Sequence, residues 1–217
     1  MTSGRLHTIS ESEILPTPEV IDRQSGELAK KLLDEVKGSN GKVVYLETSC
    51  KVSNATVFFD FASVKSKDLA TLLKDCSSAV IFVATIGHEF DRLLNKYSKI
   101  SPASAYLLQR AGLIMIENCC DKFMEHVKSE SGCELTERFS PGYGDLDLSF
   151  QNTIFNALSV EKLAGVTLTS SLLMSPSKSV SAIFGKNGIE GCNQNKKCAP
   201  KGCDSCIKKD ICKANEL

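Results

Sequence analysis

Residues 78–86 limit the fold more than any other part of this 217-residue sequence. They read SAVIFVATI, a nearly continuous apolar run. Such a run predicts a β-strand that is covered on both faces, because a strand with one face in water alternates apolar and polar residues. The run is far shorter than the roughly 20 apolar residues of a membrane helix. We therefore expect a strand inside a protein core and no membrane segment.

Helices and strands are predicted around this run without regular alternation. The longest helix begins at Ser101 and Pro102, a cap residue followed by a first-turn proline. Helices are expected near residues 18–36, 66–74, 89–97, 101–129 and 150–158, and strands or β-like pieces near 43–46, 56–61, 165–173 and 179–184. This mixture favours an α+β fold. We expect a twisted, mainly antiparallel sheet packed with a long helix and shorter helices.

Charge and motifs exclude several classes of function. The chain has 26 basic and 26 acidic residues, so it lacks the basic excess that is typical of nucleic-acid binding. The N-terminal residues contain no apolar run like that of a secretory signal, and we expect a cytoplasmic protein. No P-loop or dinucleotide fingerprint is present, and the three histidines are not grouped with a nucleophile. A self-contained hydrolase or dehydrogenase is therefore not predicted.

The ten cysteines are distributed unevenly along the chain. Five are scattered through apolar or helical surroundings and are expected to be small buried residues. The other five crowd into the last 26 residues, where composition also changes, so we expect one domain over residues 1–185 and a cysteine-rich tail over residues 186–217.

The spacing of the tail cysteines indicates a small metal site. The Cys203-x2-Cys206 pair has metal-knuckle spacing, and four thiolates suit either zinc or a 4Fe–4S cluster. Reduced or disulfide-forming thiols are the third alternative. The expected ligands are Cys198, Cys203, Cys206 and Cys212, with Cys192 as the alternate.

The segment RFSPGYGD, residues 138–145, is the strongest candidate for a ligand-binding loop. Two glycines around Tyr143 permit positive φ angles and close approach of the backbone to a ligand. Pro141 stiffens the entry to the loop, and the guanidinium of Arg138 suits a carboxylate. These features fit a small zwitterion, but from composition alone a surface turn fits as well.

Three acids upstream of this loop share one helix face. Glu117, Asp121 and Glu125 are spaced at i, i+4 and i+8 in the predicted long helix. Neighbouring acids repel one another unless a cation or hydrogen-bond donors face them. The alternatives are a solvated surface and an anchor for a cationic ligand.

A family resemblance connects these features. RFSPGYGDLDLSFQ resembles the Arg-x-x-Pro-Gly-Tyr loop of the activation domain of cobalamin-dependent methionine synthase. ATIGHEFDRLLNKYS, with the long helix after it, and LLMSPSKSVSAIFG are similar to the family's flanking segments and occur in the same order. The resemblance covers roughly residues 80–185, about half of the chain.

The resemblance implies that the loop binds S-adenosylmethionine. The family's loop ligands carry over to Arg138, Ser140, Gly142 and Tyr143, and its helix glutamate carries over to Glu125, with Asp121 beside it. An acidic ligand from the family's N-terminal segment and an aromatic contact after its Ser-Val-Ser strand have no clear match here.

The function implied is that of a stand-alone reactivation subunit for the reductive methylation of an inactive cob(II)alamin methyltransferase. No Asp-x-His-x-x-Gly motif occurs in the chain, so cobalamin is expected from a corrinoid-binding partner, and an electron donor protein is a further expected partner. One alternative is a metal-knuckle or iron–sulfur protein for electron transfer or docking, without S-adenosylmethionine chemistry. Another is an S-adenosylmethionine-dependent methyltransferase with a different acceptor.

Overall fold

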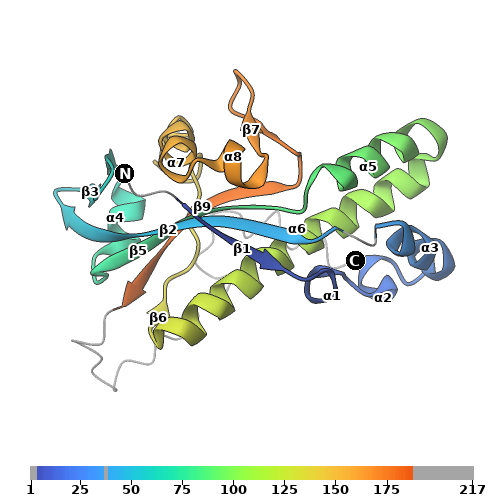
Figure 1. Cartoon of the computed structure of the whole chain (residues 1–217), viewed down its shortest axis with the longest axis horizontal. Coiled ribbons are helices and arrows are strands. Elements are labelled where there is room, and N and C mark those ends of the chain that lie inside the picture. Colours follow the sequence, from blue (N-terminus) through green and yellow to red (C-terminus); the bar gives the residue numbers. More distant parts are fainter. Residues whose placement is uncertain (1–3, 37–38, 188–217) are drawn as a thin grey trace.

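The computed structural model describes residues 4–36 and 39–187 (Figure 1). Within them, a seven-stranded antiparallel sheet is packed between helices on both faces. The predicted α+β class, with its mainly antiparallel sheet and long helix, is confirmed. None of the described helices has the length and apolarity that a membrane crossing needs. The predicted metal ligands of the cysteine-rich tail lie outside the described residues.

The sheet is built around its two longest strands. Strand β2 is long enough for β1 and β3 to pair one after the other along the same edge, while β5 pairs along the opposite edge. The order across the sheet is β4 (Ser63–Lys65), β3 (Thr56–Phe59), β2 (Gly41–Ser53), β5 (Ser78–Thr85), β9 (Ser179–Asn187) and β6 (Glu134–Leu135), with β1 (Arg5–Ile9) beside β2.

Strand β5 is buried on both faces, as its sequence predicts. Alternate side chains enter two separate cores because successive residues of a strand point to opposite faces. Val80, Phe82 and Ala84 belong to one core. Ala79 and Ile81 belong to the other, together with Val83. Each face of the sheet therefore needs its own helical cover.

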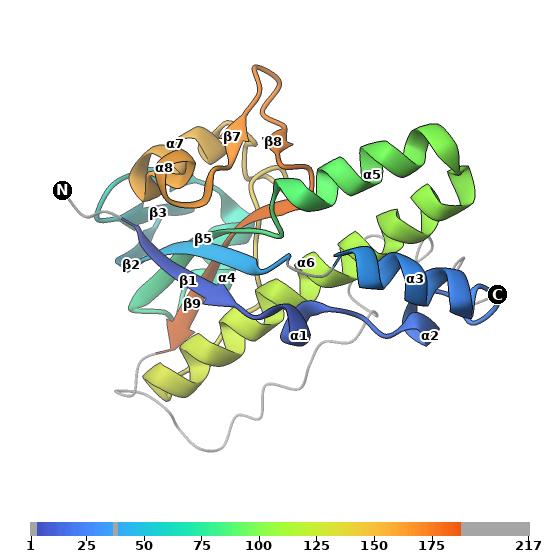
Figure 2. The same ribbon diagram turned by 45° about the vertical axis from the view of Figure 1, so that its right-hand side comes forward.

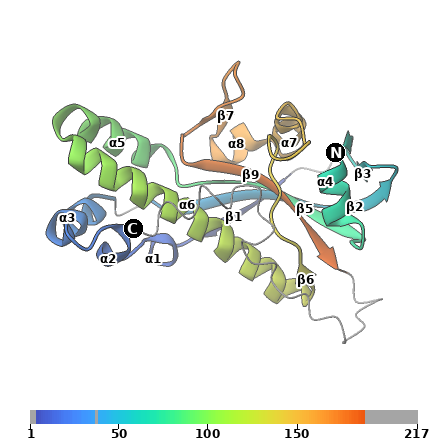
Figure 3. The same ribbon diagram turned by 180° about the vertical axis from the view of Figure 1, so that it is seen from behind.

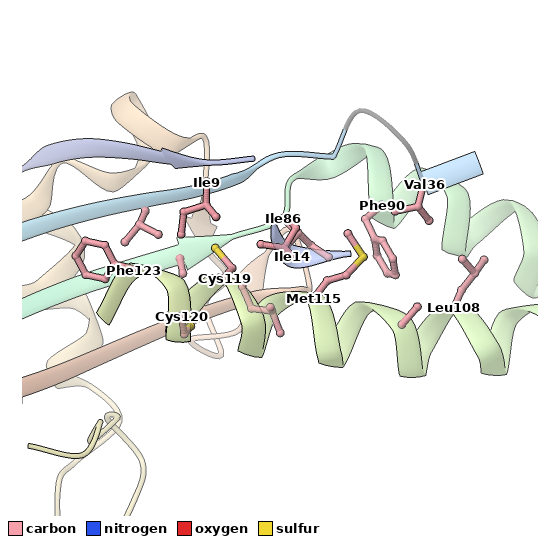
Figure 4. Packing of buried hydrophobic residues seen from close by; sticks show 14 of the residues in the cluster. Ile9, Ile14, Val36, Ile86, Phe90, Leu108, Met115, Cys119, Cys120 and Phe123 are labelled. Atoms are coloured by element: carbon pink, nitrogen blue, oxygen red, sulfur yellow. The ribbon is translucent and has the colours of Figure 1, made fainter. Parts of the chain in front are cut away.

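Helix α6 dominates the cover of the first face (Figure 2). Figure 4 shows Met115, Cys119 and Phe123 pointing from α6 into the core. The Phe123 ring lies 5.2 Å from that of Phe82. The helices whose buried residues belong to this core are α1 (Glu11–Ile14), α2 (Pro18–Ile21), α3 (Gly26–Val36), α5 (His88–Ile100) and α6 (Pro102–Ser131).

Three shorter helices cover the second face. They are α4 (Lys67–Leu73), α7 (Phe150–Leu158) and α8 (Val160–Ala164). A separate two-stranded sheet of β7 (Thr167–Leu168) and β8 (Met174–Ser175) follows α8 and leads into β9. The segment between α6 and α7 crosses the sheet beside β9 (Figure 3), and it carries the candidate binding loop.

The ends of α6 follow the predicted capping signals, whereas the helix predicted over residues 18–36 is interrupted. The Ser101 hydroxyl accepts the backbone N–H of Ser104, and Gly132 ends α6 with a φ of 64°. Between α2 and α3, the Asp22 carboxylate accepts the Gln24 amide at 2.9 Å and the Ser25 hydroxyl at 2.9 Å. An aspartate that hydrogen-bonds to the next few residues favours a turn over a continuing helix.

Four of the five scattered cysteines are buried, as predicted. Cys50, Cys76, Cys119 and Cys120 all lie in the two cores, and Cys133 is partly exposed. Burial raises the pKa of the Cys119 thiol to about 12, with a smaller contribution from Cys120. These thiols are therefore protonated at neutral pH and pack as small apolar side chains.

Candidate functional site

A pocket of about 700 Å³ opens between the candidate loop, α7 and the segment from β8 into β9. Its lining includes Arg138, Ser140 and Tyr143 from the loop and Glu117 from α6. Leu148 and Met174 contribute to its apolar wall. This volume and this mixture of a large apolar surface with a few polar groups are typical of small-molecule sites.

Backbone pairing with β9 fixes the start of the loop. Phe139 donates its amide to the Ile183 carbonyl at 2.8 Å, and Ile183 donates back to Phe139 at the same distance. This isolated bridge extends the antiparallel sheet by one residue. It holds Arg138 next to the edge of the sheet, where α6 crosses.

A carboxylate at the far end of the loop fixes it to α4. Asp145 accepts the Ser66 hydroxyl at 2.5 Å and the Lys67 amide at 2.8 Å. Its own amide donates to the Asp68 carboxylate at 3.2 Å. Asp145 thus caps the first turn of a helix that is distant in sequence, and these hydrogen bonds lower the pKa of its carboxyl.

The two glycines of the loop have the positive φ angles that the sequence predicts. Gly142 has a φ of 89° and Gly144 a φ of 52°. At Gly144 a Cβ would overlap the Asp68 carboxylate, so a larger residue would have to displace the Asp68 side chain and also adopt a positive φ. The Gly142 amide donates to the Leu146 carbonyl at 2.8 Å, which closes the turn around Tyr143.

Arg138 joins the loop to the acidic face of α6. Its Nη2 lies 2.9 Å from Glu117 Oε2 and 3.0 Å from Asp121 Oδ1, while its side chain is only 24% exposed. Both pairs share one nitrogen, and a guanidinium has five N–H donors. Arg138 therefore has donors beyond these two ion pairs.

The surroundings keep Arg138 charged. Burial disfavours the guanidinium cation, but the negative charges beside it, which at neutral pH are the carboxylates of Glu117 and Asp121, outweigh burial, so the pKa of Arg138 is raised. Burial in turn raises the pKa of Cys120 to about 12. The site therefore contains a fixed positive charge over a neutral thiol at physiological pH.

The three acids of α6 occupy different positions relative to the pocket. Glu117 lines it, and Asp121 pairs with Arg138 without contributing to the lining. Glu125 is 66% exposed and pairs with Lys122 at 2.8 Å, away from the pocket. The resemblance predicts Glu125 as the anchor, whereas the acid of α6 that lines the pocket is Glu117.

The predicted loop residues surround the pocket mouth. Ser140 and Tyr143 line the pocket, and the Tyr143 side chain is 63% exposed. Gly142 lies between them in the sequence and is not one of the residues that line the pocket. Leu173, which is 65% exposed, faces the same pocket from the segment before β8. The mouth thus presents exposed apolar side chains.

Gln151 is a pocket residue that the sequence analysis did not single out. It lies on α7 with 3% of its surface exposed, although glutamine is rarely buried. Its spacing from Ile154 and Leu158 puts it on the apolar face of α7, and a polar residue on such a face is the signal that marks it.

Residues 4–36 and 39–187 contain no group of three or more His, Cys, Asp or Glu side chains that is arranged to hold a metal ion. The five tail cysteines lie outside these residues. The predicted zinc or iron–sulfur site therefore stays a prediction from the sequence.

Comparisons with known proteins agree on the same family. Residues 134–189, which contain the loop and β9, match the family model described as the activation domain of vitamin B12 dependent methionine synthase. The predicted resemblance to this family is confirmed. No curated protein matches the sequence.

A solved structure has a fold similar to that of this chain. The chain is similar to a crystal structure of the MetH reactivation domain bound to AdoHcy, with a TM-score of 0.67 and 15% sequence identity. The similarity covers 85% of this chain and 78% of that chain. At 15% identity the structural similarity supports the fold alone. The match to the family model is separate evidence and covers the segment that contains the loop.

The Asp145 hydrogen bonds predict a pH-dependent contribution to stability. The pKa of Asp145 is lower in the folded protein than in the unfolded chain, where it is about 3.9. The contribution to stability is therefore complete at a pH above the pKa of the unfolded chain, and it is lost as the pH falls through the pKa of the folded protein. We expect Asp145→Asn to lower Tm at pH 7 and to have a smaller effect below pH about 3.9. Thermal unfolding followed by circular dichroism at several pH values measures this difference.

A matched control for Asp145→Asn is Asp75→Asn, at a side chain that is 80% exposed. It should leave Tm nearly unchanged over the same range. Two results would contradict the proposed role of Asp145. One is that Asp145→Asn and the wild-type protein have the same Tm at pH 7, and the other is that their Tm values differ by the same amount at every pH.

Proposed function

We propose that this chain binds S-adenosylmethionine in the Arg138 pocket and supports the reductive methylation of a cob(II)alamin methyltransferase. The observation that carries this proposal is the coincidence of the pocket with the segment that matches the activation-domain family. The same pocket is lined by the loop, by Arg138 and by the first half of β9. A cytoplasmic location, predicted from the sequence, remains part of the proposal.

The charges of the pocket complement those of S-adenosylmethionine. The ligand carries a carboxylate, an ammonium group and a sulfonium cation. Arg138 provides donors for the carboxylate, and Glu117 provides a negative charge for the cationic groups. Because a fixed ion pair already holds these side chains in place, the ligand meets a prearranged site.

The chain needs no acid–base residue for this role. Cobalamin on a partner protein would supply a nucleophilic cobalt after one-electron reduction, and S-adenosylmethionine supplies the methyl group. The residues of this chain bind the methyl donor and orient it toward the partner. The exposed side chains of Tyr143 and Leu173 at the mouth provide an apolar surface for a corrinoid-binding partner.

Isothermal titration calorimetry with S-adenosylmethionine, under anaerobic conditions, tests the binding site. Arg138→Ala should weaken binding at least tenfold, about 1.4 kcal/mol, because it removes the partly buried guanidinium. Arg92→Ala is the matched control, since that side chain is 74% exposed and pairs with Glu89 on α5. Folded wild-type protein that binds no S-adenosylmethionine would contradict the proposal.

The same titration decides which acid of α6 serves as the anchor. We expect Glu117→Gln to weaken binding and Glu125→Gln to leave it nearly unchanged, because Glu117 lines the pocket and Glu125 pairs with Lys122. The opposite result would favour the assignment of Glu125 that the resemblance implies. Asp121→Asn tests whether the second ion pair of Arg138 contributes.

We further propose that the tail binds a metal through Cys198, Cys203, Cys206 and Cys212, with Cys192 as the alternate ligand. The supporting observation is the spacing of these thiols, which suits zinc or a 4Fe–4S cluster. A cluster would bring a low-potential electron carrier to the corrinoid partner, and zinc would make the tail a structural or docking element.

Metal analysis and electron paramagnetic resonance of anaerobically purified protein test the tail. Cys203→Ser and Cys206→Ser should each lose the metal, because each removes a thiolate ligand. Cys119→Ser is the control, since that thiol lies on α6 and is buried in the core. Wild-type protein that holds neither zinc nor iron when purified without oxygen and chelators would contradict metal binding by the tail.

A further inference from the structure

We propose that Gln151 selects the base of the ligand, favouring an aminopurine such as adenine over an oxopurine. The inference rests on the proposed function and extends it, since it assigns a specificity-determining residue to the same pocket. Gln151 is a buried amide that borders the cavity, which is unusual because glutamine is rarely buried.

The structure holds the Gln151 side chain in a defined orientation. Its Nε2 donates to the Leu172 carbonyl at 2.9 Å, and its Oε1 accepts the Ser181 hydroxyl at 3.2 Å. These contacts come from the segment before β8 and from β9, which are both walls of the pocket. The amide is thereby fixed relative to the two segments that enclose the ligand.

Each end of this amide has unused hydrogen-bonding capacity. A primary amide has two N–H donors and two acceptor lone pairs, and the contacts to Leu172 and Ser181 use one of each. Gln151 therefore retains one donor and one acceptor on the two ends of one planar amide. A buried group of this kind is stabilised by a ligand that satisfies both.

The serines on the same wall are already engaged as donors. Ser177 donates its hydroxyl to Asp91 at 2.7 Å, and Ser179 lies within 2.8 Å of the Pro176 carbonyl and 2.9 Å of Thr85. The Ser181 hydroxyl donates to Gln151. Unlike these serines, Gln151 thus keeps both an unused donor and an unused acceptor.

That combination matches the edge of adenine. Glutamine pairs with adenine through two hydrogen bonds, accepting from the exocyclic N6 amine and donating to N7. Hypoxanthine has a carbonyl oxygen in place of this amine, so the Gln151 acceptor would face another acceptor. The charged residues Arg138 and Glu117 lie elsewhere in the pocket lining, where the aminoacyl part of the ligand would be bound.

Calorimetric titration with S-adenosylhomocysteine and S-inosylhomocysteine tests this assignment. The wild-type protein should bind the adenosyl ligand at least tenfold more tightly. Gln151→Met, which keeps a similar size without the amide, should bring the two affinities within about threefold. Arg138→Ala is the control, because it should weaken both ligands by similar factors and preserve their ratio.

The outcomes separate the two proposals. Equal affinities of wild-type protein for both ligands, or an unchanged ratio in Gln151→Met, would overturn the role of Gln151 and leave the binding site intact. Binding of neither ligand by folded wild-type protein would overturn the proposed function and this inference with it. The wild-type ratio needs no variant, so the proposal stays testable if Gln151→Met fails to fold.

Discussion

The burial of β5 on both faces organises the molecule. Its alternate side chains enter two cores, so helices must cover the sheet on each side. β9 pairs with β5 along its whole length, from Thr85 opposite Ser179 to Ser78 opposite Lys186. Strand β9 therefore contributes to the site in two ways. Its first half lines the pocket, and its Ile183 pairs with the start of the loop.

Three contacts from different parts of the fold position the binding loop. Phe139 pairs with β9, Arg138 pairs with the acids of α6, and Asp145 caps α4. Each contact joins the loop to a regular element that is packed in one of the cores. A loop fixed in this way loses little further freedom when a ligand binds, and this preorganisation favours affinity.

Local signals made much of this architecture predictable. The apolar run predicted a strand that is buried on both faces. Ser101 and Pro102 predicted the start of α6, and the loop glycines predicted the positive φ angles. Features that depend on long-range contacts were not predictable. Three acids share one face of α6, and the sequence does not show which of them lies at the pocket. That depends on where Arg138 contacts the helix, which is at Glu117 and not at Glu125. In the same way, Gln151 gains its significance from Leu172 and Ser181, which lie 21 and 30 residues away.

The central claim is that the ligand occupies the Arg138 pocket, and NMR chemical-shift mapping with S-adenosylmethionine tests it most directly. A second hollow of about 670 Å³, which Asn156 and Thr167 help to line near α8, provides an internal comparison. We expect the backbone amides around Tyr143, Gln151 and Ser181 to show the largest chemical-shift changes. Shifts concentrated around Asn156 and Thr167, with those three regions unchanged, would contradict it.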